Sequence, residues 1–277
     1  MRRSLPATIV INVVTWAVIL VVTFPLLWMI ITSVKPQDEL FRIPPSILPS
    51  HMTLEHYRSV LTETPFLLYF RNSVIIATGT TVIVVLIGAL GAYSLVRFSY
   101  PGRERLASLV LFTYLLPSVV LVIPLYLMLA RVGLANTLPS LMIAYTTFAL
   151  PFALWILRSF MAGIPADLEA AAMIDGASRM GAFRDVVLPQ ALPGIISTAL
   201  FTFILAWNEY LFALVLVNDD EARPLTTGVL TMFVSSFNVE WSLLMAASVM
   251  MSVPIIIVFA LMQRHLTSGF GAGGVKG

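Results

Sequence analysis

The sequence has no cysteine, which excludes disulfides, thiol catalysis and cysteine-ligated metal sites. Histidine is scarce too. His51 and His56 share one polar segment and His265 lies near the C-terminus, so the three do not form a metal-ligand set. Charged residues make up 11% of the chain, against about 25% in an ordinary soluble domain, and the net charge is only +2. We therefore expect neither a metal nor nucleic acid as a ligand.

Hydrophobic residues, by contrast, make up 59% of the 277 residues, and the mean hydropathy is +0.95. This composition indicates an all-α polytopic membrane protein, because a hydrocarbon core about 30 Å thick needs roughly 20 helical residues per span. The first apolar run is too long for a signal peptide, so we expect a retained helix. Six transmembrane helices are predicted, at 9–33, 66–96, 106–130, 138–157, 194–217 and 242–263. We expect Pro117, Pro124, Pro151 and Pro254 to kink their spans.

The intervening segments give the domain organisation. An even number of spans places both termini on one side of the membrane, and the segments on that side hold ten of the sixteen lysines and arginines. The positive-inside rule assigns that side to the cytoplasm. The predicted parts are a cytoplasmic N-terminus (1–8), a first transmembrane helix (9–33), an extracytoplasmic loop (34–65) with a short amphipathic helix near 54–61, a five-helix core (66–263) that includes a cytoplasmic loop (159–190), and a cytoplasmic tail (264–277).

The loop after the fourth span has an unusual pattern. Pro165 suits the first turn of a helix, Gly176 is typical of a helix end, and Ser178 suits the N-cap of a second helix that runs towards Pro189. The predicted form is a helix–turn–helix outside the membrane, with small and apolar residues in the open: Ala170, Ala171, Ala172, Ala177 and Phe183. This pattern fits either a surface that docks on another protein or a loop packed against the chain's own spans.

The spacing from Gly176 through Val186 to Leu188-Pro189 resembles the cytoplasmic loop motif of ABC importer permeases. The run IDGAS at Ile174–Ser178, the FxxVVLP run ending at Pro189, WNEYLFAL at Trp207–Leu214 and the tail GAGGVKG are similar to its carbohydrate branch, the maltose-type permeases. The family motif begins with Glu-Ala-Ala, which is followed by three further residues and then by the glycine. Here Ala170-Ala171-Ala172 occupy those positions, and Glu169 stands one position early.

The resemblance implies a type I ABC importer permease that translocates a sugar or sugar-like solute and is not itself an enzyme. It implies a second homologous permease, two ATPase subunits and an extracytoplasmic solute-binding protein as partners, in the cytoplasmic membrane of a bacterium. No cofactor is expected on this chain, because ATP and Mg bind the ATPases and the sequence has no GxxxxGK[ST] loop. The expected ATPase-docking residues are Glu169, Ala170, Ala171, Ala172, Asp175, Gly176, Phe183, Leu188 and Pro189.

Glu209 is the one acidic residue deep in an apolar run, and an intramembrane carboxylate is by default a functional hypothesis. The candidate translocation pathway comprises Phe203, Trp207, Asn208, Glu209 and Tyr210. Three alternatives stay open. Glu209 has a purely structural role, or it carries protons in a proton-coupled secondary transporter, or the chain is a membrane enzyme. The enzyme fits worst, because the sequence offers no nucleophile–base pair near a membrane face.

Overall fold

The computed structural model describes residues 5–44, 46–234 and 239–270, and the side chains of residues 8–44, 46–234 and 239–263 among them. Residues 1–4 of the predicted N-terminal segment and 271–277 of the predicted tail lie outside the described residues. Throughout the described ranges the regular structure is helical, with one isolated β-bridge between Val234 and Val239. The chain divides into two compact units, residues 1–67 with 229–253, and residues 68–228 with 254–277.

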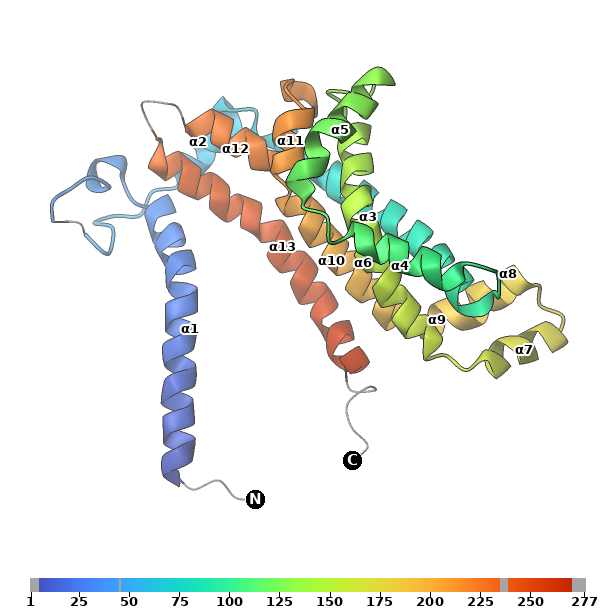
Figure 1. Cartoon of the computed structure of the whole chain (residues 1–277). Coiled ribbons are helices and arrows are strands. Elements are labelled where there is room, and N and C mark those ends of the chain that lie inside the picture. The colour runs from blue at the N-terminus through green and yellow to red at the C-terminus, as the bar shows by residue number, and fades with distance from the viewer. Residues whose placement is uncertain (1–4, 45, 235–238, 271–277) are drawn as a thin grey trace. The chain divides into compact units, whose positions relative to one another are not determined.

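The helices follow one another along the chain as shown in Figure 1. The long ones are α1 (Leu5–Ser33), α3 (Phe66–Arg97), α6 (Leu138–Ala162), α10 (Leu192–Asn208) and α13 (Trp241–Phe270). The shorter ones are η1 (Gln37–Glu39), α2 (Glu55–Glu63), α4 (Arg103–Thr113), α5 (Ser118–Arg131), α7 (Ala166–Ile174), α8 (Arg179–Ala182), η2 (Phe183–Val187), α9 (Leu188–Gln190), α11 (Leu211–Leu216), η3 (Asp220–Ala222) and α12 (Leu225–Phe233).

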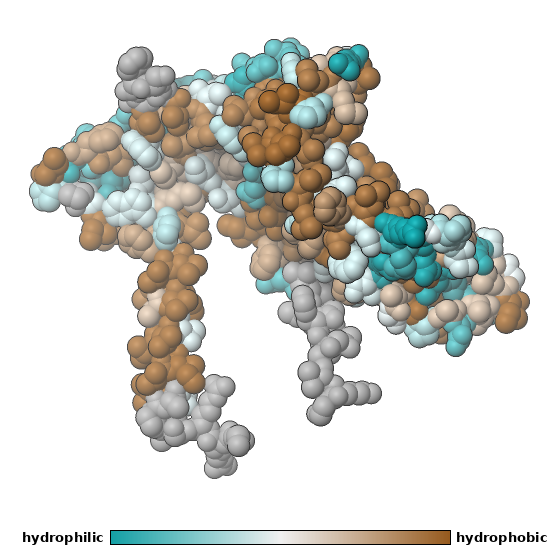
Figure 2. All heavy atoms as spheres, in the orientation of Figure 1, coloured by the Kyte–Doolittle hydropathy of each residue, from teal (hydrophilic) through white to brown (hydrophobic). Residues whose placement is uncertain are grey.

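Four of these helices are individually long and apolar enough to cross a membrane: Thr8–Ser33, Phe66–Arg97, Leu138–Ala162 and Trp241–Gln263. The number rises to six if each of two bent helix pairs counts as one span. The side chains of α1 between Ile9 and Ile30 are largely apolar and exposed, which gives this helix the hydrophobic surface seen in Figure 2. Such a surface suits hydrocarbon rather than water.

The predicted third span, 106–130, is wrong as a continuous helix. The chain ends α4 at Thr113 and starts α5 at Ser118, and the two helices differ in direction by 100°. Pro117 is the N-cap of α5, where its missing N–H costs no helical hydrogen bond. The distortion expected at Pro117 is thus confirmed in place, but it is a break and not a kink, and hydropathy does not distinguish the two. Pro124, Pro151 and Pro254, expected to kink their spans, lie inside continuous helices.

The predicted fifth span, 194–217, is also wrong as one helix. It consists of α10 and the short α11, with Glu209 and Tyr210 between them in non-helical conformation. The segment 218–241, which lies between the predicted fifth and sixth spans, contains the additional helix α12. The amphipathic helix expected near 54–61 is confirmed as α2, whose buried side includes His56 and Val60.

In the larger unit, α6 is the central helix and packs against α4, α5, α10 and α11. The helix α3 also lies against α6. A Cβ built at Gly88 or Gly91 of α3 would lie 3.1 Å from Leu157 Cδ1 or 2.8 Å from Leu154 Cδ1, respectively. These two glycines therefore permit the close approach of α3 and α6. The packing brings the cytoplasmic end predicted for α3 beside the loop that joins α6 to α10.

Gly194 makes the contact between α10 and α6 equally tight, because a Cβ there would lie 2.5 Å from Cγ of Phe160. We predict that Gly194→Val destabilises the protein by about 1–3 kcal/mol through overpacking. Thermal unfolding in detergent measures the effect. Gly163→Ala is the matched control, since its Cβ meets only the Phe160 carbonyl, at 3.4 Å. Equal unfolding temperatures for the two variants would contradict the tight contact.

Candidate functional site

The loop between α6 and α10 forms the predicted helix–turn–helix. Pro165 is the N-cap of α7, and Asp167 and Glu169 lie in its first turn, where negative charge is favoured. Gly176 follows the end of α7 with φ +96°, a left-handed conformation that glycine adopts at little cost. The Ser178 hydroxyl then accepts a hydrogen bond from the Gly181 N–H at 3.1 Å and caps α8. These features confirm the local predictions made from the sequence.

The second arm of the loop is a run of helix from Arg179 to Gln190 that includes a π-helical segment, η2. Such wider turns occur frequently at functional sites. Two buried residues of η2, Phe183 and Val187, pack into a hydrophobic cluster with Tyr93 of α3 and Leu157 of α6. The second arm is thus held against the larger unit by apolar burial.

The first arm is held by a buried polar network around Glu169. Its carboxylate pairs with the Arg97 guanidinium, with Nε and Oε2 2.7 Å apart, and also accepts a hydrogen bond from the Tyr93 hydroxyl. The side chains of Arg97 and Glu169 are 11% and 5% exposed. A second Arg97 nitrogen donates to the Ile164 carbonyl at 2.8 Å, just before α7. The last turns of α3 therefore fix both the start of the loop and its first helix.

Aromatic contacts add to this attachment. The Arg179 guanidinium lies over the Phe98 ring at 5.0 Å, and the rings of Phe183 and Tyr93 are 4.5 Å apart between centroids. Tyr93, Arg97 and Phe98, called here the α3 anchor, thus contact both arms of the loop. Displacing either arm would disturb the end of α3.

Several of the nine expected docking residues lie at the surface: Ala170, Ala171, Asp175, Gly176 and Pro189 are exposed. Two expectations need correction. Phe183 is buried at 4% exposure because it packs on Tyr93, and Glu169 is buried at 4% because it pairs with Arg97. Neither side chain is available for direct contact with another protein. Ala172 and Leu188 are half-buried.

Three large apolar side chains of the loop that were not among the expected docking residues are also exposed. Leu168, Ile174 and Met180 are 45%, 86% and 63% exposed, on both sides of the turn at Gly176. We call these three residues the apolar face of the loop. Apolar residues within a segment rich in charge were the available signal, but periodicity alone does not say which of them pack inward. An apolar face beside small alanines is suited to contact with another protein.

The five candidate pathway residues do not share one environment. Trp207 is 1% exposed and packs between the rings of Phe70 and Phe203. Asn208 is exposed and donates to the carbonyl of Ile204 in its own helix. Tyr210 is 39% exposed. Of the five, only Glu209 lines the cavity described next.

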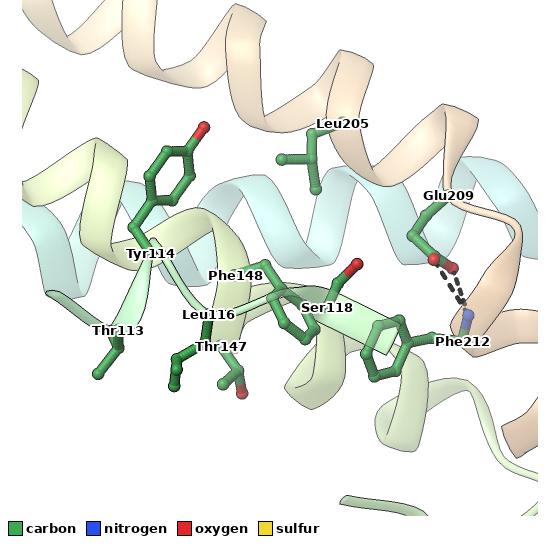
Figure 3. A pocket seen from close by; sticks show the side chains of 9 residues that line it. All are labelled: Thr113, Tyr114, Leu116, Ser118, Thr147, Phe148, Leu205, Glu209 and Phe212. Atoms are coloured by element: carbon green, nitrogen blue, oxygen red, sulfur yellow. Dashed lines mark hydrogen bonds between the residues drawn. The ribbon is translucent and has the colours of Figure 1, made fainter. Parts of the chain in front are cut away.

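That cavity, about 320 Å³, lies between the break that separates α4 from α5, the helix α6, and the junction of α10 with α11, and is shown in Figure 3. The Glu209 carboxylate accepts hydrogen bonds from the N–H groups of Phe212 and Ala213 at 3.0–3.3 Å, which caps the first turn of α11. The lining combines rings, hydroxyls and this carboxylate: Thr113, Tyr114, Leu116, Ser118, Thr147, Phe148, Leu205, Glu209 and Phe212. Glu209 therefore caps α11 and also lines the cavity.

Comparison with known proteins places the chain beside transport proteins. Residues 84–271 match the family described as "Binding-protein-dependent transport system inner membrane component". The chain is 36% identical to the diacetylchitobiose uptake system permease protein DasC of Streptomyces coelicolor, over 100% of both chains. It is 38% identical to the trehalose/maltose transport system permease protein MalG of Thermococcus litoralis, over 92% of this chain and 91% of that one.

The fold is likewise similar to a solved structure. A chain of a bacterial ABC transporter involved in the import of the acidic polysaccharide alginate superposes with a TM-score of 0.82, at 22% identity, over 95% of this chain and 99% of that one. This similarity shows that the chain has the helical membrane fold of ABC importer permeases.

The network around Glu169 yields a direct test. We predict that Glu169→Ala loosens α7 by about 3–5 kcal/mol, because Arg97 keeps a buried charge without its carboxylate. Hydrogen exchange of the α7 amides measures this local stability. Asp167→Ala removes an exposed carboxylate from the same helical turn and should cost α7 less than about 1 kcal/mol, the usual effect of one exposed charge at a helix start. If both variants exchange alike, the ion pair does not hold the loop.

Proposed function

Because the chain belongs to the family of binding-protein-dependent transport system inner membrane components, the permeases of ABC importers, we propose that its solute is a sugar or sugar-like molecule. Both relatives are named for the uptake of carbohydrates, diacetylchitobiose in one and trehalose or maltose in the other, and this supports the substrate class. The cavity beside Glu209 agrees with it chemically. Its rings can stack on the apolar faces of a sugar, and its hydroxyls and carboxylate can bond the sugar's hydroxyl groups.

Transport in this proposal is driven by other subunits. The chain is a membrane permease and not an enzyme, and two ATPase subunits with bound ATP and Mg supply the energy. A second homologous permease completes the pathway, and a solute-binding protein delivers the sugar from outside. The chain is a multi-pass membrane protein, and the excess of arginine on one side supports cytoplasmic placement of both termini.

The loop from α7 to α9 is the proposed docking surface for an ATPase subunit. The observation that carries this assignment is the apolar face, Leu168, Ile174 and Met180, which is exposed on a loop whose Phe183 and Val187 pack inward. Exposed apolar side chains of this size cost free energy in water, and a partner that covers them removes that cost. Ala170 and Ala171 beside them let a partner approach closely. Asp175 and Gly176 form the turn at its centre.

Force from the ATPase would reach the membrane through the α3 anchor. The loop is covalently continuous with α6 and α10, but its two arms also contact Tyr93, Arg97 and Phe98. A rigid displacement of the loop would therefore move three spans together. Glu169 takes part as a positioning residue, which fits its place one residue before the position where the family has its glutamate.

The pathway itself is proposed to pass Glu209 rather than all five of the residues selected from the sequence. Trp207 and Phe203 support the wall by packing, while Tyr210 and Asn208 are exposed on neighbouring positions. The proton-coupled alternative is less well supported. Its proton carrier would be Glu209, whose carboxylate already caps α11 by accepting hydrogen bonds from two backbone N–H groups.

We predict that Ile174→Glu and Met180→Glu each reduce copurification of the ATPase by roughly tenfold or more, because a charge would be buried at the centre of the interface. Pull-down from detergent-solubilised membranes measures the effect. Met52→Glu is the control, with a similarly exposed side chain, 79%, in the loop proposed to face outward. Normal ATPase recovery with both loop variants would overturn the docking assignment.

A second prediction concerns Glu209. Glu209→Gln keeps an oxygen that can cap α11 but removes the charge from the cavity, so sugar uptake should fall about tenfold while ATPase recovery stays normal. Uptake into vesicles loaded with ATP is the measurement, with the exposed Glu221→Gln as control. Unchanged uptake kinetics would leave Glu209 with its structural bond alone. Loss of wild-type uptake on adding a protonophore, with ATP present, would instead support the proton-coupled transporter.

A further inference from the structure

A separate pocket of about 430 Å³ lies in the smaller unit, where the end of α1 meets the start of α13. Trp28 and Thr32 come from the last turns of α1, and Trp241 is the first residue of α13. Lys35, Glu39 and Ser46 of the following loop complete the polar part of its lining. The transport function proposed above uses none of these residues.

The pocket contains hydrogen-bond donors that are buried without full satisfaction. The Thr32 hydroxyl, on a residue 7% exposed, and the Ser46 hydroxyl have no hydrogen-bond partner among the residues that the structure describes. The ammonium of Lys35, a residue 3% exposed, donates to the Ser46 carbonyl at 2.5 Å and lies 5.5 Å from the Trp28 ring centroid. An ammonium has three donors, so donors remain for a ligand. Buried donors of this kind are costly unless something binds them.

The position of the pocket indicates what kind of molecule reaches it. The candidate span of α1 ends at Ser33 and that of α13 begins at Trp241, so the pocket lies at the level where both leave the hydrocarbon. Trp28 and Trp241 fit the tryptophan belt found at membrane interfaces. At this level the abundant ligands with both an apolar body and a charged head are phospholipids. A cationic side chain such as Lys35 can form charge-assisted hydrogen bonds to the phosphate of such a head group.

We propose that this pocket binds the head group of an aminophospholipid, with the phosphate on Lys35, Thr32 and Ser46 and the ammonium facing Glu39. The two tryptophans flank the glycerol region, and the exposed apolar surface of α1 accompanies the acyl chains. The proposal depends on the chain's place in a membrane and not on which solute it transports.

The carboxylate explains why an aminophospholipid fits better than a purely anionic lipid. Glu39 is 3% exposed and accepts hydrogen bonds from the Ser50 hydroxyl and the Ser50 N–H. These bonds lower the pKa of the Glu39 carboxyl, so the group is ionised at neutral pH. A fixed negative charge beside a phosphate site opposes a second anion and favours a cation carried by the same ligand.

The test uses the full-length protein purified from its membrane in detergent, with the subunits that accompany it. Dioleoyl phosphatidylethanolamine, dioleoyl phosphatidylglycerol, dioleoylglycerol and inorganic phosphate are added separately. Bound lipid is counted by native mass spectrometry, and thermal unfolding is followed in parallel. Phosphatidylethanolamine should bind and stabilise. Lys35→Gln should weaken its binding by about tenfold, the usual effect of losing one charge-assisted hydrogen bond.

Two further variants keep the result interpretable. Thr32→Val retains the size of the side chain and the lysine, so it tests the donor set even if Lys35→Gln folds poorly. Arg58→Gln removes an exposed positive charge from α2 and should leave lipid binding unchanged. Glu39→Gln should narrow the preference for phosphatidylethanolamine over phosphatidylglycerol. Because lipid is counted directly, the readout does not depend on sugar transport.

The proposal is overturned if Thr32→Val and Lys35→Gln both bind phosphatidylethanolamine as well as Arg58→Gln does. It is also overturned if dioleoylglycerol, which lacks the phosphate, binds equally well. Stabilisation by millimolar inorganic phosphate without any retained lipid would assign the site to a soluble anion, and the phospholipid would then be excluded as the ligand.

Discussion

The buried ion pair between Arg97 and Glu169 is the interaction on which the candidate docking loop depends. Two charges removed from water are tolerated there because each is satisfied further, Glu169 by the Tyr93 hydroxyl and Arg97 by the Ile164 carbonyl. Replacing the pair with apolar groups would keep the region buried, but it would no longer fix the orientation of α7 relative to α3. A bond with defined geometry fixes α7 relative to α3, and so Leu168 and Ile174, the two residues of the apolar face on α7, have a defined position.

The rest of the loop follows from that fixed start. Gly176 turns the chain, Ser178 starts the second arm, and Phe183 returns to the same region of α3. The result separates two tasks on one short segment. Residues that face inward hold the loop on the bundle, whereas Ile174 and Met180 face outward, where another protein can cover them. Glu169 thus serves attachment, and the outward-facing surface consists of small and apolar side chains.

The sequence predicted the features that depend on neighbouring residues, and it did not predict those that depend on residues far apart along the chain. The caps at Pro165, Gly176 and Ser178 follow from local backbone preferences, and the helix–turn–helix was predicted in form. The partner of Glu169 is 72 residues away, and nothing in the local pattern selects it. The kink expected at Pro117 is a full break of 100°, and the break at Glu209 was missed, because an apolar run has the same hydropathy whether its helix is continuous or broken. Phe183 was assigned to the surface because periodicity does not identify which neighbour an apolar residue meets.

The bend between α4 and α5 has an electrical consequence. Its backbone leaves helical geometry between Thr113 and Ser118, and irregular backbone persists within a membrane only where protein buries it or a watery cavity adjoins it. Here the cavity that contains Glu209 adjoins it. Water that reaches such a cavity can also conduct ions, and a membrane holds its voltage only if no such route is continuous. A solute must therefore cross between two seals, at least one of which stays closed at every moment of the cycle.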